Sequence, residues 1–234
     1  TGSLDPLATG MLPICFGAAT RVSSYLLDAS KCYSVEALLG KATDTADSHG
    51  TVIAEADRPP IGGADVGAVL EEFLGESEQV PPMHSALKHQ GRRLYELARQ
   101  GIEVARPPRI VRISDICLLK YDWPTLEFTV ACSKGTYVRT LVEDISRKLG
   151  TLGHVVGLRR TAVGPFLESD MVTVETLETL KSEGPDSLAA LLQPVDSPLA
   201  VWPILVVQRE LCDRLTHGQA VAALPEWPRS FVRL

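Results

Sequence analysis

Residues 125–150 carry the clearest hydrophobic pattern in the chain. Apolar residues first alternate with polar or small ones, the period of a strand with one buried face: Leu126, Phe128, Val130 and Cys132. After Gly135 they recur at helical spacing: Val138, Leu141, Val142, Ile145 and Leu149. Gly150 suits the end of that helix. We therefore predict a strand, a tight turn and a helix, with Tyr137 and Arg139 where the strand passes into the helix, a common place for side chains that meet a ligand.

Weaker patterns predict further elements along the chain. We expect a strand over 51–54, a helix over 66–74, a short basic helix over 93–100, a strand over 107–122, and two short helices within 173–192. Three prolines in "PVDSPLAVWP" indicate a boundary. Because so few residues follow it, we expect only the start of a second domain there. The chain has no initiator methionine, which suggests that it begins inside a longer protein.

Composition excludes several classes of protein. The 234 residues are 45% hydrophobic and 22% charged, and no segment approaches the roughly 20 apolar residues of a membrane span. The first residues do not resemble a secretory signal. The five cysteines are scattered without C-x-x-C spacing, so we expect buried free thiols in a reducing cytoplasm rather than disulfides or a zinc site.

The distribution of charge matters more than its total. The formal net charge is −6, which at first argues against a nucleic-acid partner. However, residues 81–114 carry +5 and residues 134–160 carry +4, which leaves −15 for the rest. Charges more than about 8 Å away are largely screened at physiological salt, so a bound polyanion senses mainly the basic stretches. The total charge therefore does not exclude RNA.

Two acidic stretches have more than one interpretation. Asp5 precedes Pro6 in "SLDPLATG", which is typical of a helix cap, yet a carboxylate among apolar residues is also a candidate reactive group. The segment "TDTADSHG" offers hard metal ligands in Asp44, Asp47 and His49. Its spacing matches no familiar calcium or zinc loop, so we favour loop residues near a substrate.

Five ordered motifs resemble one known family. They are "GSLDPLATGMLPICFG", "KCYSVEALLGKATDTADSHG", "QVPPMHSALKHQGRRLYELARQGIEVARPPR", "CSKGTYVRTLVEDISRKLG" and "HVVGLRRTAV". Together they span nearly the whole chain and are similar to the TruB family of pseudouridine synthases, which isomerise a uridine in the T loop of transfer RNA. The residues upstream of the first motif, including a family histidine, are absent from this sequence.

The resemblance assigns roles to individual residues. It implies that Asp5 is the nucleophile, that Tyr33 stacks on the target base, and that Arg139 pairs with the catalytic carboxylate. Tyr137 and Leu158 match further residues of the base pocket. The implied pairing has a physical basis: burial raises the pKa of a carboxyl group, and a nearby guanidinium lowers it and so favours the charged form.

The segment over about 79–109 resembles an insertion that grips RNA. By this resemblance Lys88, Arg92 and Arg93 contact phosphates, and the presence of the insertion favours the stand-alone bacterial type over guide-dependent relatives. His84 stands where the family pattern has tyrosine.

The resemblance also implies an overall architecture and function. It implies an α+β catalytic domain over 1–193 with a mixed, largely antiparallel central sheet, a linker over 194–200, and part of a PUA-like RNA-binding domain over 201–234. The implied activity converts uridine to pseudouridine at position 55, in the T stem-loop of tRNA. We expect no cofactor, no metal, no membrane association and no obligate protein partner, and a cytoplasmic location.

Simpler interpretations exist for each feature taken alone. Tyr33 could be a half-buried strand residue, Arg139 a solvated residue in a first helical turn, and the basic run an exposed helix face. One rival function is a nucleoside or glycoside hydrolase that uses Asp5 with Glu143 or Asp144 as its acid. Another is an RNA-folding factor in which Asp5 only caps a turn.

Overall fold

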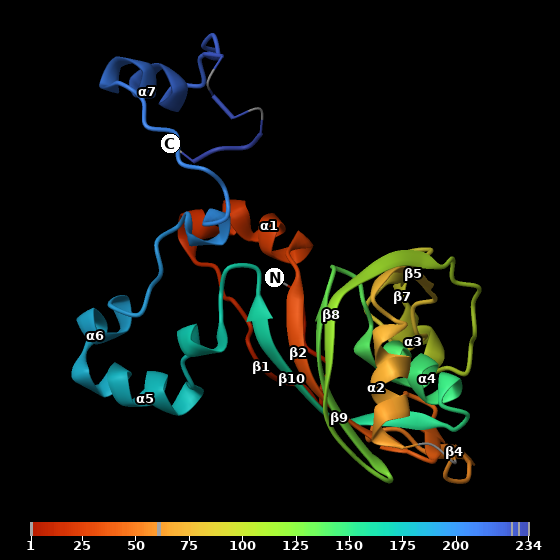
Figure 1. Cartoon of the computed structure of the whole chain (residues 1–234). Helices are drawn as coiled ribbons and strands as arrows, with labels where there is room; N and C mark the ends of the chain where they lie inside the picture. Colours follow the sequence, from red (N-terminus) through yellow and green to blue (C-terminus); the bar gives the residue numbers. More distant parts are fainter. Residues whose placement is uncertain (1, 60–61, 226, 229, 234) are drawn as a thin grey trace. The chain divides into compact units, whose positions relative to one another are not determined.

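The computed structural model describes residues 2–59, 62–225, 227–228 and 230–233. It has the expected α+β class, with helices and a mixed, largely antiparallel sheet (Figure 1). The chain divides into two compact units: Thr1–Pro13 with Leu27–Met171, and Ile14–Leu26 with Val172–Leu234. This partition differs from the limits expected from sequence, 1–193, 194–200 and 201–234, which stay a prediction. Every helix in the described part of the chain is too short or too polar to cross a membrane.

The first unit is built on a six-stranded sheet. Its strands are β1 (Thr9–Gly10), β2 (Lys31–Leu39), β5 (Gly75–Gln79), β8 (Arg109–Asp122), β9 (Thr125–Cys132) and β10 (Gly153–Val163). Their spatial order is β1-β10-β2-β9-β8-β5. β1 pairs with β10 in parallel, and the other neighbours are antiparallel. The first and last strands of the sequence motifs therefore lie side by side.

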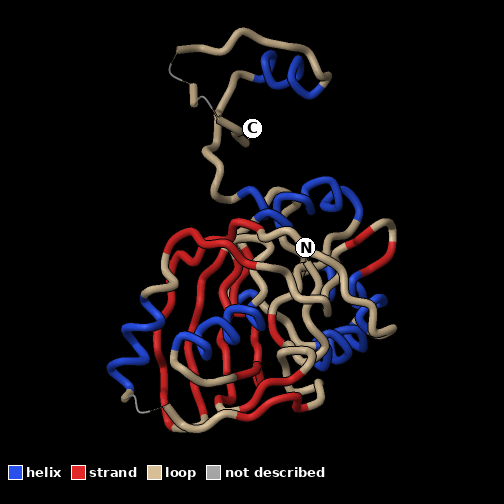
Figure 2. The backbone as a smooth tube through the Cα atoms, turned by 90° about the vertical axis from the view of Figure 1, so that its right-hand side faces the viewer, coloured by secondary structure: helices blue, strands red, loops and turns tan. Residues whose placement is uncertain are grey.

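The predicted strand, turn and helix over 126–150 are confirmed as β9 and α4 (Val138–Lys148). Phe128 of β9 and Ile145 of α4 are fully buried in the same core. α4 and α2 (Gly63–Glu71) both contact the sheet and lie on one of its faces (Figures 1 and 2). Each large apolar side chain in this layer contributes about 1.5–3 kcal/mol by leaving water. This packing fixes the start of α4, where Tyr137 and Arg139 lie.

The remaining elements of the first unit are short. They are two hairpins, β3 (Lys41–Thr43) with β4 (Val52–Glu55) and β6 (Lys88–His89) with β7 (Arg92–Arg93), the helix α3 (Leu94–Ala98) and the 3-10 turn η2 (Glu168–Asp170). The predicted strands over 51–54 and 107–122 are confirmed as β4 and β8. The helices predicted over 66–74 and 93–100 are confirmed as α2 and α3, with shifted ends.

The second unit consists of short helices and loops. Its elements are η1 (Gly17–Val22), most of α1 (Ser23–Asp28), α5 (Val174–Glu183), α6 (Pro185–Ala189), η3 (Ser197–Leu199) and α7 (Arg209–Thr216). α5 and α6 confirm the two helices predicted within 173–192. Within this unit the Trp202 ring contacts Tyr25 edge to face and stacks on Phe231, with both centroid distances 4.9 Å.

Candidate active site

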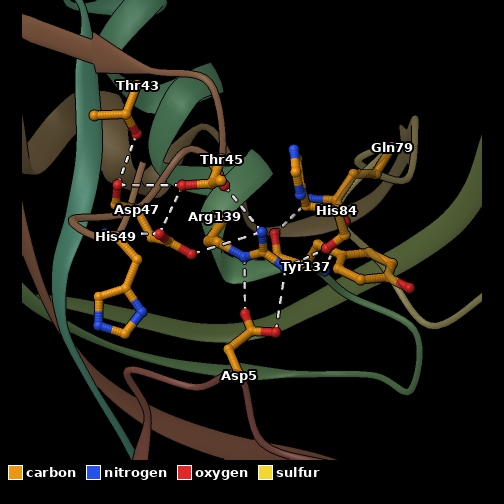
Figure 3. Close-up of polar contacts among 9 residues, drawn as sticks. All are labelled: Asp5, Thr43, Thr45, Asp47, His49, Gln79, His84, Tyr137 and Arg139. Carbon is orange, nitrogen blue, oxygen red and sulfur yellow. Dashed lines mark hydrogen bonds and ion pairs between the residues drawn. The ribbon is translucent and has the colours of Figure 1, made fainter. Parts of the chain in front are cut away.

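Asp5 lies in the loop that leads into β1, and it does not cap a helix. The backbone N–H of Ala8 donates to the carbonyl oxygen of Asp5 at 2.8 Å, which closes a turn around the acid. Both carboxylate oxygens accept hydrogen bonds from the guanidinium of Arg139 (Figure 3). Asp5 thus begins a turn, and its carboxylate contacts a cation 134 residues further along the chain.

Arg139 grips Asp5 in a two-pronged ion pair. Nε donates to Oδ2 of Asp5 at 2.8 Å and Nη2 donates to Oδ1 at 3.2 Å. The arginine side chain is 4% exposed, whereas that of Asp5 is 33% exposed. Parallel N–H bonds to both carboxylate oxygens fix orientation as well as charge. The result is a carboxylate with one side bonded to a buried guanidinium and the other open.

Backbone oxygens complete the surroundings of Arg139. Nη1 donates to the carbonyl of Thr45 at 2.9 Å, and Nη2 also donates to the carbonyl of His84 at 2.8 Å. The guanidinium is therefore locked from three segments of the chain. Because the contact at His84 is made by its main chain, it does not depend on whether histidine or tyrosine occupies that position.

The turn over 43–51 places a second carboxylate beside Arg139. Oδ1 of Asp47 accepts hydrogen bonds from Thr45 Oγ1 at 2.7 Å and from the His49 backbone N–H at 3.0 Å. Oδ2 of Asp47 lies 3.7 Å from Nη1 of Arg139 (Figure 3). Asp44 accepts from the Thr51 backbone N–H at 2.8 Å. These acids organise the turn, and the described residues contain no cluster of three or more such side chains able to hold a metal ion.

Tyr33 and Leu158 come from the paired strands β2 and β10. Tyr33 lies opposite Arg160, and Leu158 lies opposite Val35. Burial raises the pKa of Tyr33, the nearby Cys132 and Asp5 add to that rise, and the charge and hydrogen bond of Arg160 oppose it. The Tyr33 phenol therefore stays protonated across the physiological range. Neutral and half-buried, it offers an aromatic face and one polar tip.

Tyr137 is held by a buried amide that the sequence patterns did not reveal. Its backbone N–H donates to Gln79 Oε1 at 2.7 Å, and its carbonyl accepts from Gln79 Nε2 at 3.1 Å. Gln79 ends β5 and is buried. The residue before α4 is thereby tied to the opposite edge region of the sheet, which fixes where Arg139 enters the site. The sequence pattern carries no signal for this contact, because the position of Gln79 depends on the pairing of β5 with β8.

The residues assigned to the base pocket line one cavity of about 990 Å³ in the first unit. It is bordered by Asp5, Tyr33, Tyr137, Arg139 and Leu158. Residues not assigned to a role also border it, among them Lys31, Thr45, Asp47, His49, His84, Ser85 and Arg160. Burial lowers the pKa of Lys31, and the nearby Arg160 lowers it further. The cavity combines apolar walls with a few fixed polar groups, as small-molecule and base pockets do.

Lys88, Arg92 and Arg93 do not line that cavity, but the segments on both sides of them do. Leu87 precedes the β6–β7 hairpin and borders the cavity, as do Tyr95 and Arg99 in and after α3. The three basic residues are exposed on the hairpin. The structure therefore places a basic hairpin, rather than a basic helix face, beside the cavity.

Glu143 and Asp144, the acids of the hydrolase alternative, lie on α4 and do not border the cavity. Burial raises the pKa of Glu143, and Asp144 next to it contributes to that rise. Asp144 forms an ion pair with Arg147 at 2.8 Å. Neither carboxylate is placed to act on a group bound by Asp5.

Two family models match the chain. Residues 1–138 match "TruB family pseudouridylate synthase (N terminal domain)", and residues 139–200 match "tRNA pseudouridylate synthase B C-terminal domain". The first match alone covers more than half of the chain and contains Asp5 and Tyr33.

Individual relatives agree with the family models. The chain is 51% identical over 232 residues to tRNA pseudouridine synthase B of Stutzerimonas stutzeri, which covers 98% of the chain and 75% of the relative. It is 49% identical over 235 residues to the protein of that name from Nitrosococcus oceani, covering 100% of the chain and 76% of the relative.

A solved structure shows the same fold. The chain in a Cbf5–Nop10–Gar1 complex aligns with a TM-score of 0.71 at 27% identity, over 93% of the present chain and 57% of that one. Sequence and fold therefore lead to the same assignment, and the chain belongs to the TruB family of pseudouridylate synthases.

Proposed function

We propose that this protein isomerises uridine to pseudouridine in tRNA, at position 55 of the T loop, with Asp5 as its nucleophile. The observation that carries the proposal is the two-pronged Asp5–Arg139 pair at the wall of a cavity that also contains Tyr33 and Leu158. The relatives named tRNA pseudouridine synthase B support the reaction and the substrate class.

The reaction makes demands that this cavity meets. The bond between uracil N1 and ribose C1′ breaks, a bond between C5 and C1′ forms, C5 loses its proton and N1 gains one, so the RNA keeps its mass. The carboxylate of Asp5 attacks an electron-poor carbon of the nucleotide and is expelled again as a carboxylate before the product leaves, and the attack requires its charged form. Arg139 maintains that charge while one third of the Asp5 side chain stays exposed to the cavity.

The target base must leave its stack to reach Asp5. Flipping costs a few kcal/mol, and stacking on an aromatic side chain returns about 1–3 kcal/mol. Tyr33 supplies such a ring, and its raised pKa keeps the hydroxyl able to donate a hydrogen bond. Leu158 and Tyr137 add apolar wall to the same cavity. In this role the Tyr33 ring replaces part of the stacking that the target base loses when it leaves the RNA stack.

The β6–β7 hairpin supplies the RNA grip in this proposal. Lys88 lies directly opposite Arg93 in the hairpin, a pairing of like charges that destabilises an isolated strand pair. Phosphates between them would relieve that repulsion. Because the hairpin is joined to the cavity wall at Leu87 and Tyr95, phosphate contacts there would place the T loop over the cavity.

The remaining assignments follow from this function. Reaction through the protein's own carboxylate needs no cofactor or metal. We infer that the chain acts without an obligate protein partner, since it contains the RNA-gripping segment itself, and that it works in the cytoplasm. The five cysteines are free thiols, which suits that compartment.

The decisive experiment follows tritium release from tRNA labelled at uridine C5. Wild type should release tritium without releasing free uracil. Asp5→Asn should bind tRNA normally and release none. Asp28→Asn is the matched control, because Asp28 is an exposed carboxylate paired with Lys134, and it should release tritium at the wild-type rate.

Two results would contradict the proposal. Free uracil in the product would indicate a hydrolase. Loss of tRNA binding or of folding in Asp5→Asn, with tritium release unchanged per bound tRNA, would make Asp5 a structural acid.

A further inference from the structure

Arg160 is a buried cation beside the Asp5 loop that the proposed mechanism does not use. It is 2% exposed and is the largest of the fully buried side chains. Its Nε donates to the carbonyl of Met11 at 2.7 Å, and its Nη2 donates to the carbonyl of Gly2 at 3.2 Å. Its own carbonyl accepts from the backbone N–H of Met11 at 2.8 Å. One residue thus fastens the chain both before and after Asp5.

Packing alone does not account for a charge at this position. A buried guanidinium is costly unless its donors are bonded, and an apolar side chain of similar volume is often no worse for stability. No carboxylate of a described residue lies within ion-pair distance of Arg160. Its donors go instead to the main chain of the Asp5 loop, and its charge and hydrogen bond act on Tyr33 across the β2–β10 pair.

The other side of this contact is equally specific. Gly10 in β1 pairs with Arg160 and has φ +94°. A Cβ added at Gly10 would lie 2.3 Å from the carbonyl oxygen of Arg160. The two strands approach so closely that only glycine fits, which leaves the Asp5 loop little freedom to move relative to β10.

We propose that Arg160 is a positioning residue, which holds the loop from Gly2 to Met11 so that Asp5 meets Arg139 next to the Tyr33 ring. This inference rests on the proposed function for its catalytic readout only. A displacement of about 1 Å at a reacting group is enough to cost about 100-fold in rate. The expected signature is therefore a loss in the chemical step without a loss in tRNA binding.

The test compares Arg160→Met, Arg160→Lys and Gly10→Ala with wild type and with Arg159→Gln. Single-turnover tritium release at saturating tRNA should fall about 100-fold in Arg160→Met and about tenfold in Arg160→Lys, which keeps the charge but has one donor nitrogen where the guanidinium uses two. Gly10→Ala should lower the rate as Arg160→Met does. The dissociation constant for tRNA should change less than threefold in each. Arg159 is exposed and paired with Glu168, so Arg159→Gln should change neither quantity.

Hydrogen exchange of the free proteins gives a readout independent of activity. Peptides covering 2–11 should exchange faster in Arg160→Met, while peptides from β9 keep the wild-type rate. The proposal fails if the single-turnover rate stays within threefold of wild type, if the loss lies in tRNA binding, or if exchange rises equally throughout the sheet. Should Arg160→Met not fold, Arg160→Lys and Gly10→Ala decide by the same measurements. If wild type itself releases no tritium, the proposed function fails, and the exchange of residues 2–11 still decides whether Arg160 holds the loop.

Discussion

The cations of the first unit fall into two groups, one buried and one exposed. Around the cavity, Arg139 and Arg160 are buried and their donors end on fixed oxygens. On the β6–β7 hairpin, the basic side chains are exposed, and no carboxylate of a described residue lies within ion-pair distance of them: Lys88, Arg92 and Arg93. Arg92 and Arg93 each donate one hydrogen bond to a neutral oxygen, of Gln100 and Ala86, which leaves their charge uncompensated. Buried, bonded charges hold geometry and are little affected by salt, whereas exposed charges without a carboxylate partner can neutralise phosphates and are screened by salt. We therefore expect variants of the buried cations to lower the single-turnover rate, and variants of the hairpin to lower tRNA affinity.

Removing the cation of the buried pair should have the largest effect. Arg139→Met leaves Asp5 without its two-pronged partner and Asp47 without a nearby charge, so single-turnover tritium release should fall at least about 10³-fold. Arg139→Lys keeps the charge but loses the fork, and it should recover only part of this loss. The apparent tRNA affinity in filter binding should change little. A rate near that of wild type in Arg139→Met would show that the pair is structural.

Asp47 tests the second layer of the buried region. Asp47→Ala removes the acceptor for Thr45 and His49 together with the charge facing Arg139, and we expect a loss of about 100-fold in the single-turnover rate. Asp47→Asn keeps an acceptor oxygen for the turn and should lose about tenfold. If both variants are equally impaired, the charge matters and the turn does not. Unchanged rates in both would remove Asp47 from the site.

Neutralising the hairpin should affect binding and spare chemistry. With Lys88, Arg92 and Arg93 all replaced by Gln, tRNA affinity at 0.1 M salt should fall about tenfold. The slope of log affinity against log salt should flatten by about 2, the value for three single-strand phosphates. The single-turnover rate at saturation should stay within threefold. Lys41, Lys120 and Arg147 form the matched control triple, since each already has a surface carboxylate partner. Equal slopes for the two triples would refute the hairpin as the footprint.

The hydrophobic pattern of the sequence predicts some elements of the fold and not others. β9 and α4 were predicted because each buries one face, so that hydrophobic period and structure coincide. β10 was missed because it lies inside the sheet, and its pairing with β2 shifts after Val155 and after Arg160, which interrupts any alternation. β5, with the sequence "GESEQ", has little strand propensity, and its pairing with β8 holds it in the sheet.

Some residues of the site could likewise be predicted from the sequence, and others could not. Motif resemblance gave Asp5, Tyr33, Tyr137, Arg139 and Leu158, and the structure brings all five to one cavity. No periodicity relates Asp5 to Arg139, which are 134 positions apart. The carbonyls of Thr45 and His84 escaped prediction because a backbone acceptor carries no residue signature. Gln79 and Arg160 escaped because their roles depend on tertiary pairing.

Glu143 is intermediate between the buried and the exposed charges: it is half-buried on α4, one helical turn beyond Arg139. Its replacement gives the smallest predicted effect. Burial and Asp144 raise its pKa above the ordinary 4.5, so the folded chain binds this proton more tightly than the unfolded chain does. The resulting stability is fully present below pH 4.5 and is lost as the pH rises through the folded pKa. Glu143→Gln removes this dependence. Its melting temperature relative to wild type should therefore rise by about 2 °C between pH 4 and pH 7.

Two measurements distinguish this electrostatic effect from other causes. Glu71→Gln, at an exposed position on α2, should show no such pH-dependent gain over wild type in the same thermal unfolding series. Tritium release by Glu143→Gln should stay within about twofold of wild type, because Glu143 does not border the cavity. Abolished turnover would instead make Glu143 the acid partner of Asp5, as the hydrolase alternative requires. Arg139 borders the cavity, whereas Glu143 lies one turn further along α4 and does not. Glu143 is therefore expected to affect stability and not the reaction.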